Sequence, residues 1–169
     1  MSYTALRSYV KDIAESLDSN VLYTDGRKEV IHLLREAPPD NLGVVVWCLP
    51  FIGSGSFTEI GQQFNETVTV NIIFYKQDYQ GSELNQDTPE SLQDEIRVLY
   101  ETKDVADEFV RKFNFNQINT TLQETSEDIE IQSVTFDNVI KDNDYLLTGT
   151  FVSMNITIPD DFNYCSFIS

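Results

Sequence analysis

The sequence predicts one α+β domain, with a mostly antiparallel sheet, an N-terminal amphipathic helix and one long helix packed across one face. Its 169 residues suit a single domain, and no linker or internal repeat divides residues 1–169. Apolar residues recur at helical spacing in two segments, whereas other segments are β-branched runs or alternate with the period of a strand. Hydrophobic residues make up 41% of the chain, which excludes disordered and collagen-like classes.

The two predicted helices are marked by stripes of apolar residues. Near the N-terminus, residues at steps of three and four form one face of a helix from Tyr3 to Leu17. The longest predicted helix runs from Ser91 to Phe113 and carries acidic residues opposite its stripe. Between them, Arg27–Glu36 fits either a short helix or a strand. The apolar stripe of the long helix consists of Leu92, Ile96, Leu99, Ala106, Phe109, Val110 and Phe113.

The predicted strands begin with a short extended piece, Val21–Tyr23. Leu42–Phe51 is an apolar run rich in β-branched residues and is typical of a buried strand. The next segment, Gly53–Ser56, is expected to be a flexible loop. In Thr67–Tyr75, Val68, Val70, Ile72 and Phe74 alternate with polar residues, as in an antiparallel sheet with one covered face.

The C-terminal third predicts a hairpin of two strands, Ile129–Phe136 and Tyr145–Ile158, joined by a turn at Asp142–Asp144. The alternation slips between Ile131 and Val134, which predicts a β-bulge. One face of the second strand is expected to carry Thr148, Thr150, Val152, Met154, Ile156 and Ile158.

The charge balance excludes several classes of partner. There are 28 acidic and 11 basic residues, for a net charge of −17. Specific nucleic-acid binding depends on Lys and Arg side chains that displace counterions from the phosphates. A surface as acidic as this one repels both phosphate backbones and anionic lipid. No signal peptide is recognisable, and no apolar run approaches the roughly 20 residues that span a bilayer.

No catalytic, cofactor-binding or metal-binding site is predicted. The single histidine, His32, cannot supply both a triad base and a metal cluster, and we expect it at or near the surface. Gly53-Ser54-Gly55 lacks the third glycine and the Lys-Ser/Thr of a phosphate-binding loop. Asp142–Asp144 lacks the glycine and the closing glutamate of a calcium loop, so a turn is favoured. The acidic run from Glu124 to Glu130 is expected to be a solvated face.

A metal-dependent nuclease signature is matched in letters only, by Pro39-Asp40 and Glu101-Thr102-Lys103. That chemistry needs the Glu-x-Lys on a strand, whereas this triplet falls inside the long predicted helix. Cys48 and Cys165, 117 positions apart, are expected to be buried free thiols.

The layout of the whole chain resembles the tail terminator (tail-completion) proteins of long-tailed bacteriophages. The resemblance implies a non-enzymatic virion protein without cofactors, assembled in the host cytoplasm. It would form a homohexameric ring that caps the tail tube and joins it to the head connector, while DNA passes through the lumen unbound. The resemblance is carried by Tyr3–Leu17, Val44–Pro50, Thr67–Asp78, Leu92–Phe113 and Leu147–Pro159.

A ring requires one side of the subunit to be complementary to the other, and sheet edges are suitable contact surfaces. Aromatic residues in the segments 51–64, 76–89 and 162–164 are therefore candidates for the subunit or partner interface, although they could equally fold back on the subunit's own core. These candidates are Phe51, Phe57, Phe64, Tyr79, Phe162 and Tyr164.

Two other functions remain open from the sequence. One is a different phage neck or tail component, such as a connector adaptor or a tube-type subunit. The other is an acidic adaptor or inhibitor that mimics nucleic acid, which the acidic composition favours. A small-molecule-binding domain is a weaker alternative.

Overall fold

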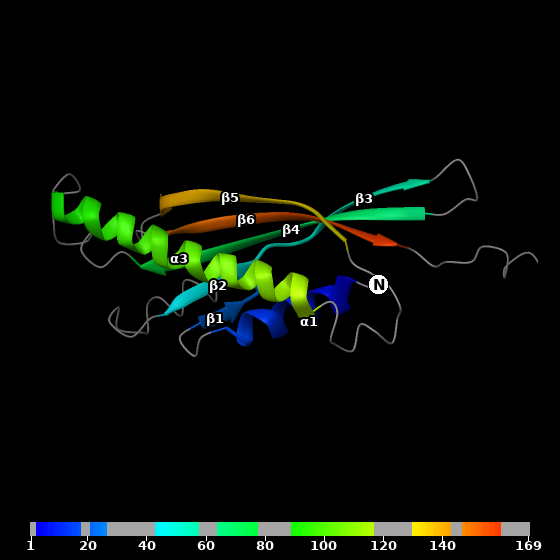
Figure 1. Cartoon of the computed structure of the whole chain (residues 1–169), viewed down its shortest axis with the longest axis horizontal. Coiled ribbons are helices and arrows are strands. Elements are labelled where there is room, and N and C mark those ends of the chain that lie inside the picture. The colour runs from blue at the N-terminus through cyan, green and yellow to red at the C-terminus, as the bar shows by residue number, and fades with distance from the viewer. Residues whose placement is uncertain are drawn as a thin grey trace, which may run out of the picture.

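The computed structural model describes residues 3–17, 21–26, 43–57, 64–77, 89–116, 130–142 and 147–159. Within these residues the chain is a mixed α+β structure with a six-stranded, mostly antiparallel sheet and two helices, as the sequence predicts (Figure 1). The elements in chain order are α1 (Tyr3–Glu15), β1 (Val21–Thr24), β2 (Val44–Cys48), β3 (Ile52–Phe57), β4 (Phe64–Gln77), α3 (Pro89–Asn116), β5 (Glu130–Asp142) and β6 (Leu147–Pro159).

The sheet is organised around β4, its long central strand. The strand order is β1-β2-β4-β6-β5, with β3 pairing with β4 beside β2. β1 and β2 are parallel, and every other pair is antiparallel. The second half of β4 pairs with β2 and the first half with β3, so β2 and β3 follow one another along the same side of β4. At the junction between them, the Leu49 amide donates to the Asn71 carbonyl at 2.9 Å.

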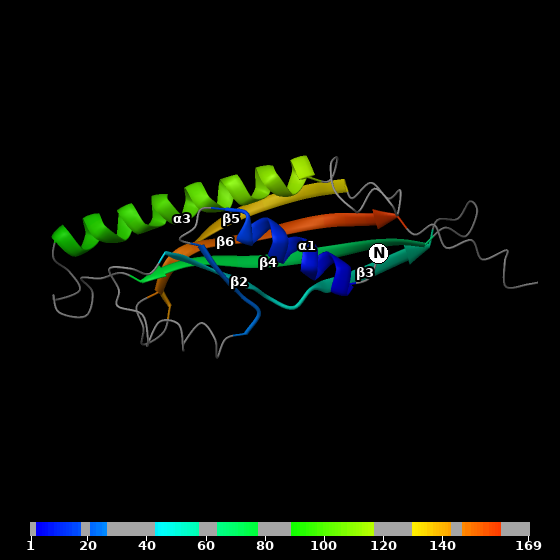
Figure 2. The ribbon, with the colours of Figure 1, turned by 90° about the horizontal axis from the view of Figure 1, so that it is seen from below.

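One face of the sheet carries the main hydrophobic core. The predicted alternation of β4 is confirmed, because Val68, Val70, Ile72 and Phe74 are all fully buried. They share one cluster with apolar residues of both helices, and Figure 2 shows the helices on the same side of the strands. The other members include Leu6, Val10, Ile13, Val44, Val46, Phe109, Phe113, Val152, Met154 and Ile156.

The opposite face is divided between an apolar and a polar half. Around the pairing of β2 with β4, Val45, Ile73 and Tyr75 are buried in a second, smaller cluster. Toward the β3 end, the side chains form a hydrogen-bonded row across three strands. Thr69 Oγ1 donates to Asn155 Oδ1 at 2.8 Å, and Asn155 Nδ2 donates to Ser133 Oγ at 3.0 Å.

The largest correction concerns Gly53–Ser56, predicted as a flexible loop. These residues belong to strand β3, which pairs with β4 from Ile52↔Thr69 to Phe57↔Phe64. Gly and Ser have weak strand propensity, so these four residues carry no local signal of a strand. Pairing with the first half of β4 stabilises it instead. The predicted strand Leu42–Phe51 is correspondingly shorter, because β2 spans only Val44–Cys48.

The stripe of α3 also requires correction, because Ile96 is 49% exposed. Val98 and Thr102 are buried in its place, followed by Ala106, Phe109 and Phe113. Thr102 is accommodated because its hydroxyl lies 3.1 Å from that of Thr150 on β6 and also from the Leu99 carbonyl. The side chain of Leu92 lies outside the described part.

The C-terminal hairpin is confirmed, with a first strand that continues beyond the predicted Phe136 to Asp142 and a second that begins at Leu147 and ends at Pro159. β5 and β6 are antiparallel neighbours, and a register shift falls between Ile131 and Ser133, where the bulge was expected. The faces of β6 are as predicted from Thr148 to Ile156. The ambiguous segment 27–36, His32, the acidic run 124–129, the turn residues 143–144 and Cys165 lie outside the described residues.

Candidate assembly surface

Phe51 is the only sequence-predicted interface residue whose side chain is described, and it is half-buried. It packs against the main core, and its ring meets the Tyr3 ring edge-on at 6.1 Å between centroids. The Arg7 guanidinium lies 5.7 Å from the centre of the same ring. Phe51 therefore contributes part of its surface to its own subunit, and only the remainder is available to another molecule.

Phe57 and Phe64 are brought together by the backbone. They form the last residue pair in the antiparallel β3–β4 register, at the far end of the hairpin that β3 and β4 make. Figures 1 and 2 show β3 and the start of β4 extending beyond the ends of β5 and β6. Within the predicted 51–64 loop, residues 52–57 and 64 thus belong to two projecting strands. Tyr79, Phe162 and Tyr164 lie outside the described residues.

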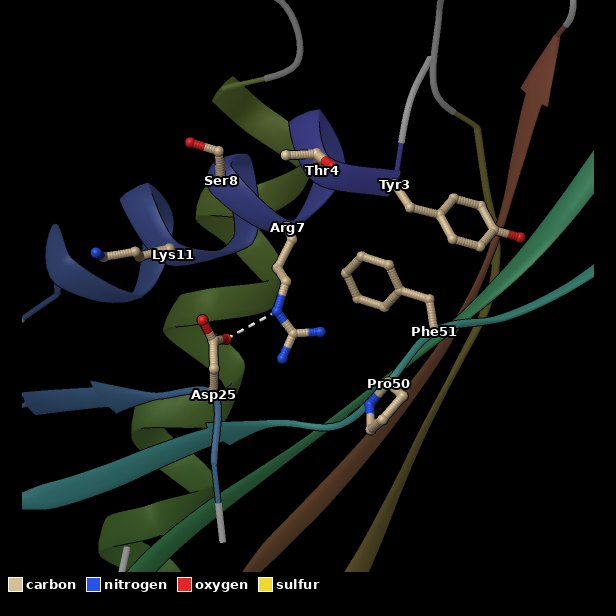
Figure 3. Close-up of a pocket in the computed structure, with 8 residues that line it drawn as sticks. All are labelled: Tyr3, Thr4, Arg7, Ser8, Lys11, Asp25, Pro50 and Phe51. Carbon is tan, nitrogen blue, oxygen red and sulfur yellow. Dashed lines mark hydrogen bonds and ion pairs between the residues drawn. The ribbon is translucent and has the colours of Figure 1, made fainter. Parts of the chain in front are cut away.

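An open groove of about 540 Å³ runs beside α1. The helix supplies residues at positions 3, 4, 7, 8 and 11, which share one helical face. The end of β1 and the residues after β2 form the other wall (Figure 3). We call this feature the α1 groove, and it is lined by Tyr3, Thr4, Arg7, Ser8, Lys11, Asp25, Pro50 and Phe51.

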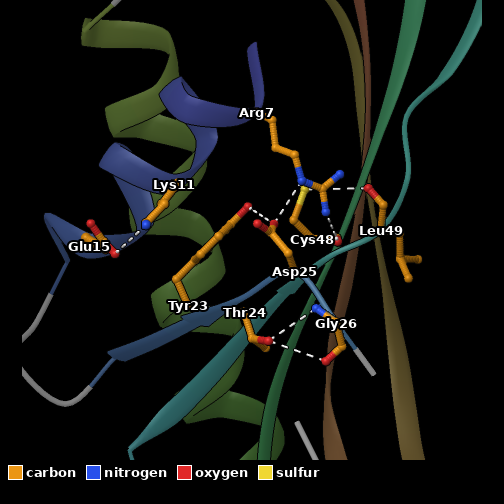
Figure 4. A network of polar contacts seen from close by, with 9 residues as sticks. All are labelled: Arg7, Lys11, Glu15, Tyr23, Thr24, Asp25, Gly26, Cys48 and Leu49. Carbon is orange, nitrogen blue, oxygen red and sulfur yellow. Dashed lines mark hydrogen bonds and ion pairs between the residues drawn. The ribbon is translucent and has the colours of Figure 1, made fainter. Parts of the chain in front are cut away.

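Arg7 holds the groove together by bridging the helix to two strands. Its Nε donates to Asp25 Oδ1 at 2.9 Å, and its Nη2 donates to the Cys48 carbonyl at 3.1 Å (Figure 4). The Tyr23 hydroxyl donates to the same Asp25 oxygen at 2.5 Å. One turn along α1, the half-exposed Lys11 lies 3.7 Å from Glu15. The groove therefore presents two cations one helical turn apart, of which Lys11 is the more loosely held.

The ionisable groups near the groove do not indicate acid–base or nucleophilic chemistry. Burial raises the pKa of the Cys48 thiol to about 11, and the Arg7 charge only partly opposes this shift. The thiolate that would act as a nucleophile is therefore disfavoured. Burial, followed by the hydrogen bond to Asp25, raises the pKa of Tyr23 far above its usual range. A hydrogen bond to Glu66 raises the pKa of Tyr3.

The other motifs considered in the sequence fall into structural roles. Glu101 and Lys103 lie on α3, as predicted, and not on a strand. Glu101 pairs with Lys76 of β4 and with Arg97. Although partial burial opposes it, the hydrogen bond and charge of Lys76 lower the pKa of Glu101. Within the described residues, no group of three or more His, Cys, Asp or Glu side chains could hold a metal ion. Cys48 is a buried free thiol, as expected.

Two opposite sides of the sheet carry exposed large hydrophobic side chains that the sequence reasoning missed. At the β5 side, Ile140 of β5 is accompanied by Ile96 and Tyr100 of α3. Ile96, Tyr100 and Lys103 share one helical face, and Lys103 Nζ lies 3.8 Å from the Phe136 ring centre on β5. This contact turns that face of α3 toward the edge strand. We call Ile96, Tyr100 and Ile140 the β5 edge.

The other side consists of Tyr3 of α1, Leu22 of β1 and Ile52 of β3, which we call the β1–β3 edge. Leu22 lies on the outermost strand of the β1-β2-β4-β6-β5 order, and Ile52 opens β3. Among the described residues, these two edges contain all of the exposed large hydrophobic side chains, with exposed fractions of 39% to 69%. A signal for Ile52 was available, because an isoleucine beside a Gly-Ser run is unusual in a solvated loop.

Neither the comparison with protein-family models nor the search of curated proteins found a match to this chain. None of the described helices is both long enough and apolar enough to cross a membrane.

Proposed function

We propose that this chain is a structural subunit of the tail-terminator type, which assembles side by side into a ring that caps a tail tube. In this proposal each subunit has its two helices stacked on one face of the sheet and uses its two edges for contacts. The β5 edge of one copy contacts the β1–β3 edge of the next. The protein has no catalytic role in this proposal, and its partners are further copies of itself, the tube and the head connector.

The observation that carries the proposal is the placement of the exposed hydrophobic residues. Ile96, Tyr100 and Ile140 lie at one edge, and Tyr3, Leu22 and Ile52 lie at the other. Scattered apolar residues on a surface require no explanation, whereas concentration at two opposite edges is typical of contact surfaces. Among the described strands, β1, β3 and β5 each pair on one side only, so both edges present strand backbone suited to pairing with another chain.

Two different edges favour a ring over a two-fold dimer. A dimer joins the same surface on both subunits, whereas contact between different surfaces passes from copy to copy until it closes. The number six rests on the family resemblance alone. The strongly negative charge suits a ring whose lumen conducts DNA, because a negative wall repels the phosphate backbone and does not retain it.

The test is the absolute mass by light scattering after size exclusion, at low and high salt. Like charges oppose assembly most when screening is weak. We therefore expect a species of about six times the 19.4 kDa subunit mass, favoured by salt. A strict monomer at every salt and protein concentration would contradict self-assembly.

The two edges can be tested separately with paired variants. Variant A carries Tyr100→Ser and Ile140→Ser, and variant B carries Leu22→Ser and Ile52→Ser. Each alone should be a monomer with a native far-UV circular dichroism spectrum. Mixing A with B leaves one intact interface, between the β1–β3 edge of A and the β5 edge of B, so the mixture should form dimers and nothing larger. Rings formed by either variant alone would exclude its edge from the interface.

The hairpin candidates provide a third variant, with Phe57→Ser and Phe64→Ser together. If the hairpin end takes part in the ring, this variant should lose assembly while its far-UV spectrum stays native. Loss of the folded spectrum would instead assign the two rings to the subunit's own core.

A further inference from the structure

We propose that the α1 groove is the receptor for α3 of the neighbouring copy, with Tyr100 seated beside Arg7 and Phe51 and with Asp104 facing Lys11. This inference rests on the proposed ring and specifies its central contact. The occupant is a second copy of this chain.

The groove is continuous with the β1–β3 edge. Tyr3 belongs to both, and Phe51 immediately precedes Ile52, the most exposed residue of that edge. A copy that covers Tyr3 and Ile52 must therefore also cover the groove between α1 and the end of β2. Figure 3 shows the Phe51 ring and the Arg7 side chain facing one another across this space.

Charge complementarity selects the occupant. The groove combines Arg7 and Lys11 with a single acidic residue, Asp25, in a chain with only 11 basic residues against 28 acidic ones. The exposed surface of α3 provides the opposite charge at Asp104, which lies one turn beyond Tyr100. An acidic side chain that enters the groove meets attraction, whereas most of the surface of a second copy would repel it.

The spacing of the two helices also matches. Tyr100 and Asp104 are four residues apart on α3, and Arg7 and Lys11 are four residues apart on α1, which separates each pair by about 6 Å along its helix. The Arg7 guanidinium uses Nε for Asp25 and Nη2 for the Cys48 carbonyl. One side of this guanidinium already lies toward the Phe51 ring, with 5.7 Å to its centre. A planar guanidinium held in this way can stack a second aromatic ring on its other side.

A charge exchange tests the contact between Lys11 and Asp104. Both side chains are exposed in the subunit, so their replacement should leave the fold intact. Lys11→Glu and Asp104→Lys should each raise the protein concentration at half-assembly by about tenfold, the effect of losing one close interfacial charge pair. The double variant should restore assembly, because every interface in a homomer would then contain the exchanged pair.

The two single variants change the net charge in opposite directions. A general charge effect would therefore weaken assembly in one variant and strengthen it in the other. Arg111→Glu is the matched control for Lys11→Glu, since it makes the same charge change at an exposed position near the end of α3, and it should leave assembly unchanged. Far-UV circular dichroism of each variant, with Lys11→Gln as a milder substitution, identifies any loss of folding.

The failure of this inference is distinguishable from the failure of the proposed ring. If the parent protein forms rings that neither Lys11→Glu nor Asp104→Lys weakens, the ring stands and the groove contact is overturned. If weakened single variants are not rescued by the double variant, the two residues do not face one another, which also overturns it. A parent protein that is monomeric under all conditions overturns both.

Discussion

The two faces of the sheet are built from the same strands, yet they differ in construction. On the helix-covered face, β4 presents an unbroken apolar row that is sealed beneath α1 and α3. On the opposite face, the row changes from apolar at Ile73 and Tyr75 to polar at Thr69, whose hydroxyl is bonded to Asn155. The helix-covered face therefore stabilises the fold by burying apolar side chains, whereas half of the opposite face is linked by side-chain hydrogen bonds. Substitutions on the two faces should accordingly have very different costs.

The largest difference is expected between Val70 and its neighbour Asn71. Val70 is fully buried on the helix-covered face, so Val70→Asp places an unpaired charge in the core. We expect a loss of at least about 4 kcal/mol, enough to unfold many domains of this size. Asn71→Asp introduces the same charge on the opposite, partly exposed face and should cost no more than about 1 kcal/mol. Urea unfolding measures both, and a folded Val70→Asp protein would show that the strand register is wrong.

The glycines Gly149 and Gly53 sharpen the comparison, because they face opposite sides of the sheet. A Cβ at Gly149 would lie 1.9 Å from the Phe74 carbonyl oxygen, so β4 and β6 would have to separate. We expect Gly149→Ala to cost about 3 kcal/mol. A Cβ at Gly53 would meet the ends of two side chains, the Tyr3 hydroxyl at 1.8 Å and Glu66 Oε1 at 2.7 Å, and both side chains can move. Gly53→Ala should therefore cost clearly less in the same unfolding assay, and an equal cost would contradict this assignment.

Within the helix-covered core, the threonine pair should show an asymmetry. Thr102 donates to the Leu99 carbonyl and also contacts the Thr150 hydroxyl. Thr102→Val leaves the Thr150 hydroxyl buried without that partner and should cost about 1–2 kcal/mol. Thr150→Val leaves Thr102 with the Leu99 carbonyl and should cost less. The double variant, which removes both hydroxyls, should be no less stable than Thr102→Val in thermal unfolding.

The smallest effect is expected in the polar half of the opposite face. Asn155→Ala removes the hydrogen bonds to Thr69 and Ser133. Because these side chains are partly solvated, water can replace the lost partners, and we expect a cost of about 0.5–1 kcal/mol. A loss larger than that of Thr102→Val, measured by the shift of the unfolding midpoint, would mean that this row contributes as much to stability as the core.

The sequence predicted the elements whose pattern is set by a single buried face. β4 and β6 alternate because one side of each strand meets the helices, and α1 shows a clear stripe for the same reason. The β-bulge near Ser133 was also predictable from the sequence, because an interruption of the apolar–polar alternation indicates a shift in strand register. The candidate site was less accessible. Of the six predicted interface residues, only Phe51 has a described side chain, and it belongs partly to the core.

The failures share a physical cause, which is that partners distant in the sequence decide the outcome. Gly53–Ser56 forms a strand because β4 lies alongside it, and Thr102 is buried because Thr150 meets it 48 residues away. Ile96 was assigned to the core on periodicity, although its side chain is 49% exposed beside the edge strand β5.

The sequence by itself determined the class of the fold, its acidic surface and the apolar rows of β4, β6 and α1, because these depend on composition and local periodicity. Only the tertiary structure decided the parallel pairing of β1 with β2, the α1 groove and the two hydrophobic edges. Each of these joins residues from separate segments. A local sequence pattern does not indicate which distant segment will lie next to it, because contacts between distant segments form only when the chain folds.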